Sequence, residues 1–378
     1  MIAKTVYLDY AATTPVDARV IEVMMQHLGA DGVFANPASL AHPAGLAANQ
    51  AVRIAREQVA GLINAEPAEI IWTSGATEAI NLALKGALQL YKNRGKHIVT
   101  WKTEHKAVLD TCQYLEKNGF IVTYLKPLAT GLIDLKEFAQ ALREDTVLVT
   151  VMQINNEIGV IQDIDAIAAI TSARGILLHV DAAQSVGKIA IDVSRTPVDL
   201  MSLSAHKIYG PKGVGALYVR RKPRVRVAPL IHGGGQELGM RSGTLPTHQI
   251  VGMGAAFALA AENMLADQKK ISQLRTQFLD KLAGCDFKIN GDVAHTWPGI
   301  INLCFPGYVA KDLMQKLPEL ALAVGSACTN TSVEPSYVLR ALGLSTELAQ
   351  SALRISLGRF TTEEEVDFAV GRFLEILR

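Results

Sequence analysis

The sequence predicts an α/β protein built on a mostly parallel sheet with helices on both faces. Between about residues 69 and 220, short runs rich in β-branched residues alternate with segments whose apolar residues recur at helical spacing. The runs are almost continuously apolar, which is typical of strands buried on both faces of a parallel sheet. Such alternation of strand and helix is the sequence pattern of an α/β fold.

Seven runs are expected to form the strands, and amphipathic segments lie between several of them. In chain order the runs are EIIWTSG, HIVTW, FIVTYL, TVLVTVMQ, ILLHVDAA, DLMSLSAH and GALYVR. DLKEFAQALRE and DIDAIAAITSARG have the apolar spacing of helices that pack on such a sheet. The sequence therefore predicts a seven-stranded, mostly parallel sheet.

A long helical stretch, THQIVGMGAAFALAAENMLADQKKISQLRTQFLDKLAG, follows the last run. It is too long for one small core, so we expect it to lead into a second domain. The predicted division is a large domain over residues 16–260, and a smaller α+β domain formed by residues 1–15 and 261–378.

Composition narrows the functional class. The 378 residues carry a formal charge of only +1, so no bulk charge favours nucleic acid or a membrane surface. Four cysteines without regular spacing argue against a disulfide framework and a CxxC metal site, and HExxH spacing is absent. There is no apolar run of signal-peptide length at the start, and nowhere do about 18 consecutive apolar residues occur. We expect a cytoplasmic protein without a metal, a membrane contact or direct nucleic-acid binding.

One cysteine stands in unusual surroundings. Cys112, Cys285 and Cys304 lie in segments where a small core residue is the ordinary interpretation. Cys328 instead lies in the polar, turn-forming stretch VGSACTNTSVEP. A thiol that solutes can reach is a potential nucleophile when it ionises; the alternative is a chance surface cysteine, unless the rest of the chain supplies chemistry that needs sulfur.

Ligands of open parallel sheets bind beyond the carboxyl ends of the strands, where this sequence places several polar residues. WTSGATEAIN ends a strand with small residues and opens a helix, so backbone N–H groups and the hydroxyl of Thr77 could bind a phosphate. An ordinary helix cap is an equally good interpretation of that motif alone. Asp181 follows a buried run, with Gln184 three residues later. A buried carboxylate there could keep a ring nitrogen protonated, or merely cap a helix.

SLSAHKIYGPKG is the most informative stretch. Ser204, His206 and Lys207 end one strand, and a turn leads directly into another, so the glycines do not form a dinucleotide fingerprint. A lysine near phosphate donors and a buried aspartate suits a Schiff base, although a surface charge is the alternative. His105 and Asn156 complete the same edge; the histidine could stack on an aromatic cofactor, move protons or cap a helix. Together these residue types favour pyridoxal 5'-phosphate.

The motifs resemble those of a known family. SLSAHKIYGPKG, NNEIGVIQDI, HGGGQELGMRSGT and VGSACTNTSVEPSYVLRALG are similar to the cysteine desulfurases of the housekeeping and nitrogen-fixation type, within the class V aminotransferases. The similarity runs from YLDYAATTP to SLGRFTTEEE, nearly the whole chain. It implies the pyridoxal-phosphate-dependent fold-type I, aspartate aminotransferase-like, in its long cysteine-loop class.

The resemblance also assigns roles to single residues. Lys207 would hold the cofactor as a Schiff base, and the other cofactor-binding residues would be Asp181, Gln184, His105, Ala76, Thr77, Ser204, His206 and Thr244. Thr244 would reach in from the second subunit of a homodimer. The carboxylate of the substrate, L-cysteine, would bind Asn156 and Arg354, and Cys328, Lys207 and His105 would be catalytic.

The activity that the resemblance implies is removal of sulfur from L-cysteine, giving L-alanine and a persulfide on Cys328. The sulfur would pass to acceptor proteins for iron–sulfur cluster assembly or for thiolation of tRNA, DNA or a cofactor. The alternatives are a selenocysteine lyase or another class V aminotransferase-like enzyme, and an inactive interaction subunit. The chain ends at Arg378, whereas many relatives continue with a tail that helps dock a scaffold protein. The basic run RRKPRVR is either a solvated strand edge or a docking patch for acidic acceptors.

Overall fold

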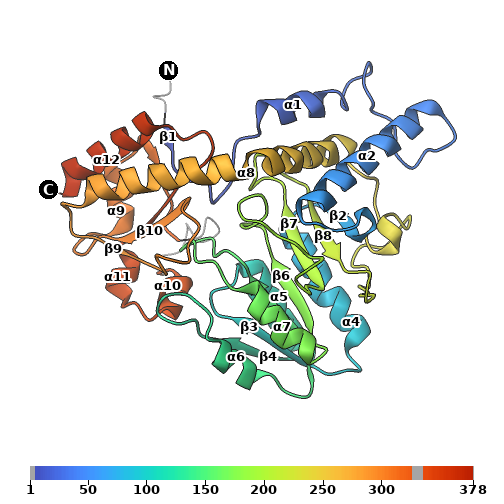
Figure 1. The fold of residues 1–378 in the computed structure, drawn as a ribbon, viewed down its shortest axis with the longest axis horizontal. Coiled ribbons are helices and arrows are strands. Elements are labelled where there is room, and N and C mark those ends of the chain that lie inside the picture. Colours follow the sequence, from blue (N-terminus) through green and yellow to red (C-terminus); the bar gives the residue numbers. More distant parts are fainter. Residues whose placement is uncertain (1–4, 326–334, 378) are drawn as a thin grey trace.

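The computed structural model describes residues 5–325 and 335–377 and has a seven-stranded sheet at its centre (Figure 1). The strand order is β2-β8-β7-β6-β5-β3-β4, and all neighbours are parallel except those of β8, which is antiparallel to β2 and β7. The strands are β2 (Ile70–Thr73), β3 (His97–Trp101), β4 (Ile121–Leu125), β5 (Thr146–Met152), β6 (Leu177–Asp181), β7 (Leu200–Ser204) and β8 (Gly215–Val219). Each predicted run corresponds to one strand, so the expected α/β sheet is confirmed.

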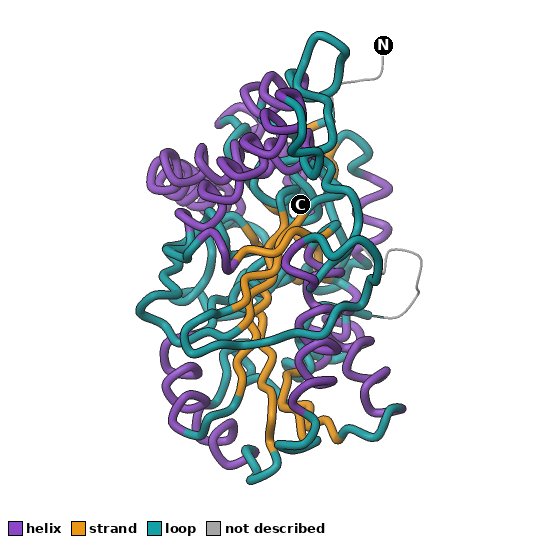
Figure 2. Tube along the Cα trace, turned by 90° about the vertical axis from the view of Figure 1, so that its right-hand side faces the viewer, coloured by secondary structure: helices purple, strands orange, loops and turns teal. Residues whose placement is uncertain are grey.

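Helices cover both faces of this sheet, and Figure 2 shows the strands between helices on either side. The helices of this region are α1 (Ala18–Met25), α2 (Pro43–Leu62), η1 (Pro67–Glu69), α3 (Ala76–Asn81), the π-helical turn η2 (Leu82–Gly86), α4 (Ala87–Tyr91), α5 (Lys106–Lys117), α6 (Leu135–Ala141), α7 (Ile164–Ala173) and η3 (Glu237–Gly239). Successive strand residues point to opposite faces. Thus Val149 of β5 packs in one hydrophobic cluster with α2 and α7, while Leu148 packs in another with α3 and α5. Burial on both faces explains why the runs are apolar throughout.

The remaining elements form a second group around two further hydrophobic clusters. They are β1 (Val6–Tyr7), β9 (Lys288–Ile289), β10 (Ile300–Cys304), α9 (Ala310–Lys316), β11 (Leu320–Ala321), α10 (Tyr337–Ala341), α11 (Thr346–Gln350), β12 (Ala352–Ser356) and α12 (Glu363–Leu377). A sheet of order β12-β10-β9 and the parallel pair β1-β11 lie here. The amino-terminal Val6 and Leu8 share a cluster with Phe305 and Phe373. The predicted domain boundaries remain a prediction.

Helix α8 (Thr247–Leu282) links the two groups and runs along both in Figure 1. Its Met253 and Phe257 belong to the cluster of the large sheet, and its Leu274 and Phe278 belong to the second cluster. Within the described part of the chain, α8 is the one helix whose length and hydropathy would suffice to cross a membrane. These four side chains are buried against the rest of the protein, as in the core helix of a folded domain.

Candidate active site

The carboxyl ends of the parallel strands border a cavity of about 580 Å³. It is lined by ten of the residues that the sequence singled out: Ala76, Thr77, His105, Asn156, Asp181, Gln184, Ser204, His206, Lys207 and Arg354. Asp181 and Ser204 are the last residues of β6 and β7, so the strands themselves place these two side chains at the edge. The structure brings together residues that lie up to 278 positions apart, from Ala76 to Arg354.

Two predicted site residues are not in this cavity. Thr244 is exposed on a loop of the described chain and does not line the cavity. Its predicted contribution from a second subunit stays a prediction. Cys328 lies outside the described residues. Of the other cysteines, Cys112 is buried in α5, and burial raises the pKa of its thiol to about 12, so it is a core residue and a poor nucleophile.

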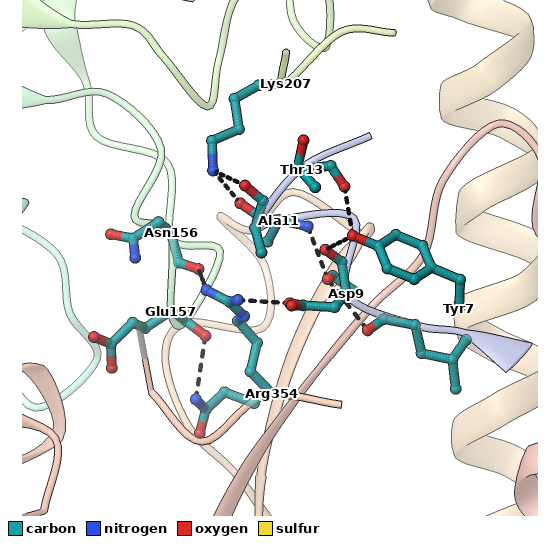
Figure 3. A network of polar contacts seen from close by, with 12 residues as sticks. Tyr7, Asp9, Ala11, Thr13, Asn156, Glu157, Lys207 and Arg354 are labelled. Carbon is teal, nitrogen blue, oxygen red and sulfur yellow. Dashed lines mark hydrogen bonds and ion pairs between the residues drawn. The ribbon is translucent and has the colours of Figure 1, made fainter. Parts of the chain in front are cut away.

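Lys207 is held by the amino-terminal segment. Its Nζ donates hydrogen bonds to the carbonyl oxygen of Ala11 and, at 2.8 Å, to that of Ala12 (Figure 3). The same segment also contacts the neighbouring histidine, since His206 Nδ1 lies 3.1 Å from Thr13 Oγ1. Burial, followed by the charge of Lys207, lowers the pKa of His206 to about 4. A neutral imidazole therefore faces the cavity near neutral pH.

Asp181 is buried and His105 is half-buried, and the two side chains influence each other electrostatically. Asp181 is 3% exposed, and its Oδ1 accepts a hydrogen bond from the backbone N–H of Ala183 at 3.0 Å. Burial raises the pKa of this carboxyl group, while His105 and Lys207 act in the opposite direction. Burial likewise lowers the pKa of His105. A cationic partner in the cavity would compensate the desolvated carboxylate.

His105 has the helix-capping role that the sequence left open, and its predicted roles toward a cofactor stay predictions. It is the N-cap residue of α5, where its Nδ1 accepts a hydrogen bond from the backbone N–H of Ala107 at 3.1 Å, and it also lines the cavity. Because Nδ1 is an acceptor, the neutral ring carries its hydrogen on Nε2. The cap thus fixes the tautomer of the histidine.

Arg354 enters the cavity from β12, and 1% of its surface is exposed. Its Nη1 donates to the carbonyl oxygen of Asn156 at 2.9 Å, and its Nη2 donates to Asp9 Oδ1 at 2.7 Å (Figure 3). Arg354 Nε and Asn156 Oδ1 are buried and have no hydrogen-bond partner among the described residues. The guanidinium thus keeps donors for a further anion.

The end of the cavity near α3 has unused hydrogen-bond donors. Ser204 Oγ is buried and has no partner among the described residues. Gly75 precedes α3 at φ +153°, and a Cβ there would meet no atom within 4 Å, so the backbone borders open space. Glu78 brings a negative charge to this end, but it pairs with Arg241 at 2.9 Å. These features fit a phosphate group.

Sequence reasoning missed Asp9 and Lys188, which contact the predicted site residues Arg354 and Gln184, and Glu78, which lines the same cavity. Asp9 lies within YLDYAATTP and Glu78 within WTSGATEAIN, but neither motif says which arginine each carboxylate contacts. Lys188 follows Gln184 by four residues, a spacing that could have suggested a contact in a helical turn. Across residues 5–325 and 335–377, no group of three or more His, Cys, Asp or Glu side chains is arranged to hold a metal ion.

Comparison with known proteins shows the family of this chain. Residues 6–368 match the family model described as aminotransferase class-V. The chain is 58% identical over 366 residues to the cysteine desulfurase IscS of Proteus mirabilis strain HI4320, covering 97% of this chain and 91% of that protein. The corresponding protein of Escherichia coli O139:H28 gives the same values.

Solved structures indicate the same family. A NifS-like protein superimposes with a TM-score of 0.92 at 38% identity, covering 99% of both chains. A structure described as SspA in complex with cysteine superimposes with a TM-score of 0.84 at 41% identity, covering 94% of this chain and 99% of that one. The fold-type I prediction is confirmed, and the chain belongs to the class V aminotransferase family, among its NifS- and IscS-like members.

Proposed function

We propose that the protein is a cysteine desulfurase, which uses pyridoxal 5'-phosphate to take sulfur from L-cysteine and release L-alanine. Relatives that are 58% identical over 97% of the chain carry the name cysteine desulfurase. The observation that carries the proposal is the convergence of Lys207, Asp181, Ser204 and Arg354 on one cavity. These side chains supply an amine, a buried carboxylate, a free hydroxyl and an anion-binding guanidinium.

Three groups of residues would hold the cofactor. Thr77, Ser204, His206 and the backbone at Ala76 would bind its phosphate, with Thr244 of a second subunit completing the site in a homodimer. Asp181 would face the ring nitrogen, Gln184 the ring hydroxyl and His105 the ring face. Lys207 would bind its aldehyde carbon. When bound, pyridoxal phosphate supplies an electron sink that stabilises negative charge at the substrate Cα.

Arg354 and Asn156 would fix the substrate carboxylate. Two of the five guanidinium N–H groups are used by Asp9 and the Asn156 carbonyl, so three remain for a carboxylate. Because Arg354 is buried, a carboxylate binding there would be largely shielded from water, which strengthens the charge-assisted contact. This contact orients the Cα–H bond toward Lys207.

Lys207 and His105 would move protons. Lys207 Nζ, once free, would take the proton from the substrate Cα and return it during formation of alanine. His105 would face the substrate thiol through Nε2–H, because Nδ1 is occupied by the backbone of α5, and in this tautomer it would donate a hydrogen to the sulfur. The lowered pKa of His105 favours the neutral imidazole; to take a proton from the thiol, the ring would first have to release the Ala107 N–H and change tautomer.

Sulfur transfer would depend on Cys328, which lies outside the described residues. Its thiolate would form a bond with the substrate sulfur while the carbon–sulfur bond breaks, and a proton would be added to the carbon. The products are L-alanine and a persulfide on Cys328. An acceptor protein would then take the sulfur, for iron–sulfur cluster assembly or for thiolation. We expect these steps in the cytoplasm.

The test is to purify the protein with pyridoxal phosphate and to measure alanine and sulfide from L-cysteine with a reductant. Alanine and sulfide in equal amounts are expected. Absence of alanine from a preparation that shows the cofactor's visible band would disprove the proposal. Selenocysteine is assayed in parallel, and a large preference for it would favour the selenocysteine lyase alternative.

A further inference from the structure

A lysine that does not line the main cavity contacts one of the residues that do. Lys188 Nζ donates a hydrogen bond to Gln184 Oε1 at 2.7 Å. Gln184 is 3% exposed, and its Nε2 donates to the carbonyl oxygen of Ala11 at 2.8 Å. Lys188 lines a second, smaller cavity of about 30 Å³, which Lys207 also borders. Lys188 is therefore close to the site without being part of its lining.

The chemistry of these groups settles which end of the amide faces which partner. A protonated lysine only donates hydrogen bonds, so the carbonyl oxygen of Gln184 faces the ammonium group of Lys188. The NH₂ end then faces Ala11, whose carbonyl oxygen accepts one of its two hydrogens. The same carbonyl oxygen accepts from Lys207, so the two lysines are connected through Gln184 and Ala11. One N–H of the amide remains for an acceptor in the cavity.

We propose that Lys188 is a positioning residue, which holds the amide of Gln184 with its N–H end toward the cofactor's ring hydroxyl. The inference rests on the proposed function, because it takes Gln184 as the partner of that oxygen. Without Lys188 the amide could turn over and present its carbonyl oxygen to the ring oxygen, an unfavourable contact between two acceptors. Lys188 thus acts through Gln184 and not on the substrate.

The contact between Lys188 and Gln184 is possible in both charge states of the lysine. Burial lowers the pKa of Lys188 to about 7, and the charges of Lys207 and Arg354 act in the same direction. Charged Asp267 and Arg359 line the smaller cavity from α8 and the segment after β12, together with Tyr10 and Tyr209. The ammonium form can only donate to Gln184, whereas the neutral amine has two N–H groups and a lone pair, so it can still donate to Gln184 Oε1 but does not by itself exclude the reversed amide.

The experiment compares the holoenzyme with Lys188→Met, which keeps an apolar stem and removes the donor. Two properties are measured: the dissociation constant of pyridoxal phosphate, and the pH midpoint of its visible absorbance band. Loss of one oriented hydrogen bond is expected to weaken cofactor binding by about three- to tenfold. The pH midpoint is expected to move by about half a unit or more, since the ring oxygen loses a donor.

A Gln184→Ala variant and the double variant separate positioning from general destabilisation. If Lys188 acts through Gln184, Lys188→Met should add little to the effect of Gln184→Ala. Fully additive effects would overturn the inference, and so would a Lys188→Met protein with the parent's dissociation constant and pH midpoint. Should Lys188→Met fail to fold, Lys188→Gln replaces it, because a glutamine can turn either end and does not fix its neighbour.

Failure of the desulfurase proposal and failure of the positioning role of Lys188 would give different results. A parent protein that binds the cofactor and forms no alanine disproves the desulfurase function. An active parent with an unaffected Lys188→Met variant overturns only the positioning role.

Discussion

Arg354 and Asp9 form an ion pair of 2.7 Å that joins residues 345 positions apart in the chain. The guanidinium is 1% exposed and the carboxylate side chain 19% exposed. Asp9 lies just after β1, and Arg354 is the central residue of β12. The pair therefore fixes the arginine that we assign to the substrate carboxylate against the amino-terminal segment that binds Lys207 (Figure 3).

Asp9→Ala should destabilise the protein. It leaves a buried guanidinium without its counter-charge, which costs about 3 kcal/mol of unfolding free energy. Asp9→Asn should cost less, because the amide oxygen still accepts a hydrogen bond. Denaturant unfolding checks both values. Asp145→Ala is the matched control: its pair with Arg143 is about half-exposed, so less than about 1 kcal/mol is expected. Equal losses in Asp9→Ala and the control would contradict the assignment.

Lys207→Ala should abolish the visible absorbance of the protein purified with pyridoxal phosphate and should abolish alanine formation. The amine is the only group in our proposal that can bond to the cofactor's aldehyde carbon. Lys212→Ala is the control, since this lysine also lines the cavity but is exposed at its mouth. Absorbance spectra of both variants test whether Lys207 bonds to the cofactor. A parent-like spectrum for Lys207→Ala would refute the role.

Cys328→Ala should keep the cofactor's visible band and lose alanine production from L-cysteine. The cofactor contacts all come from other residues, whereas the sulfur has no acceptor without the thiol. Cys285→Ala, a partly buried cysteine, serves as the control and should keep the parent's rate. Alanine is quantified under single- and multiple-turnover conditions. Normal turnover by Cys328→Ala would remove this residue from the mechanism.

His179→Gln should change how stability depends on pH. His179 is fully buried between Thr150 Oγ1 and Ser202 Oγ, and burial lowers its pKa from 6.5 to about 3. Between these values the unfolded chain binds a proton that the folded protein does not, so His179 makes stability fall as the pH falls from 6.5 toward 3.

The difference in unfolding free energy between parent and variant should therefore change by up to about 1.4 kcal/mol per pH unit in that range. Above pH 7.5 the difference should be constant. Urea unfolding at a series of pH values measures it. A difference that is constant from pH 4 to 8 would show that His179 is protonated equally in both states.

The sequence predicted the sheet and the lining of the cavity for one physical reason. Strands buried on both faces are apolar throughout, and their carboxyl ends meet at one edge, so polar residues that end such runs lie together. Asp181 and Ser204 are the clearest cases, since each is the last residue of its strand.

The contacts among these residues could not be predicted from the sequence. Asp9 lies in an amino-terminal segment whose path depends on the pairing of β1 with β11, and no local pattern specifies that pairing. The direction of the Gln184 amide depends on Lys188 and on the Ala11 carbonyl together. The sequence assigned Arg354 to the substrate carboxylate but did not predict that it is also paired with Asp9.

The separation of Asp9 from Arg354 also matters during synthesis. The ribosome makes Asp9 before every strand of the large sheet and Arg354 after all of them. A nascent chain can therefore pair the strands of the large sheet long before it can build an anchor for the substrate. Until Arg354 has been made, the growing polypeptide lacks the side chain that we assign to the substrate carboxylate.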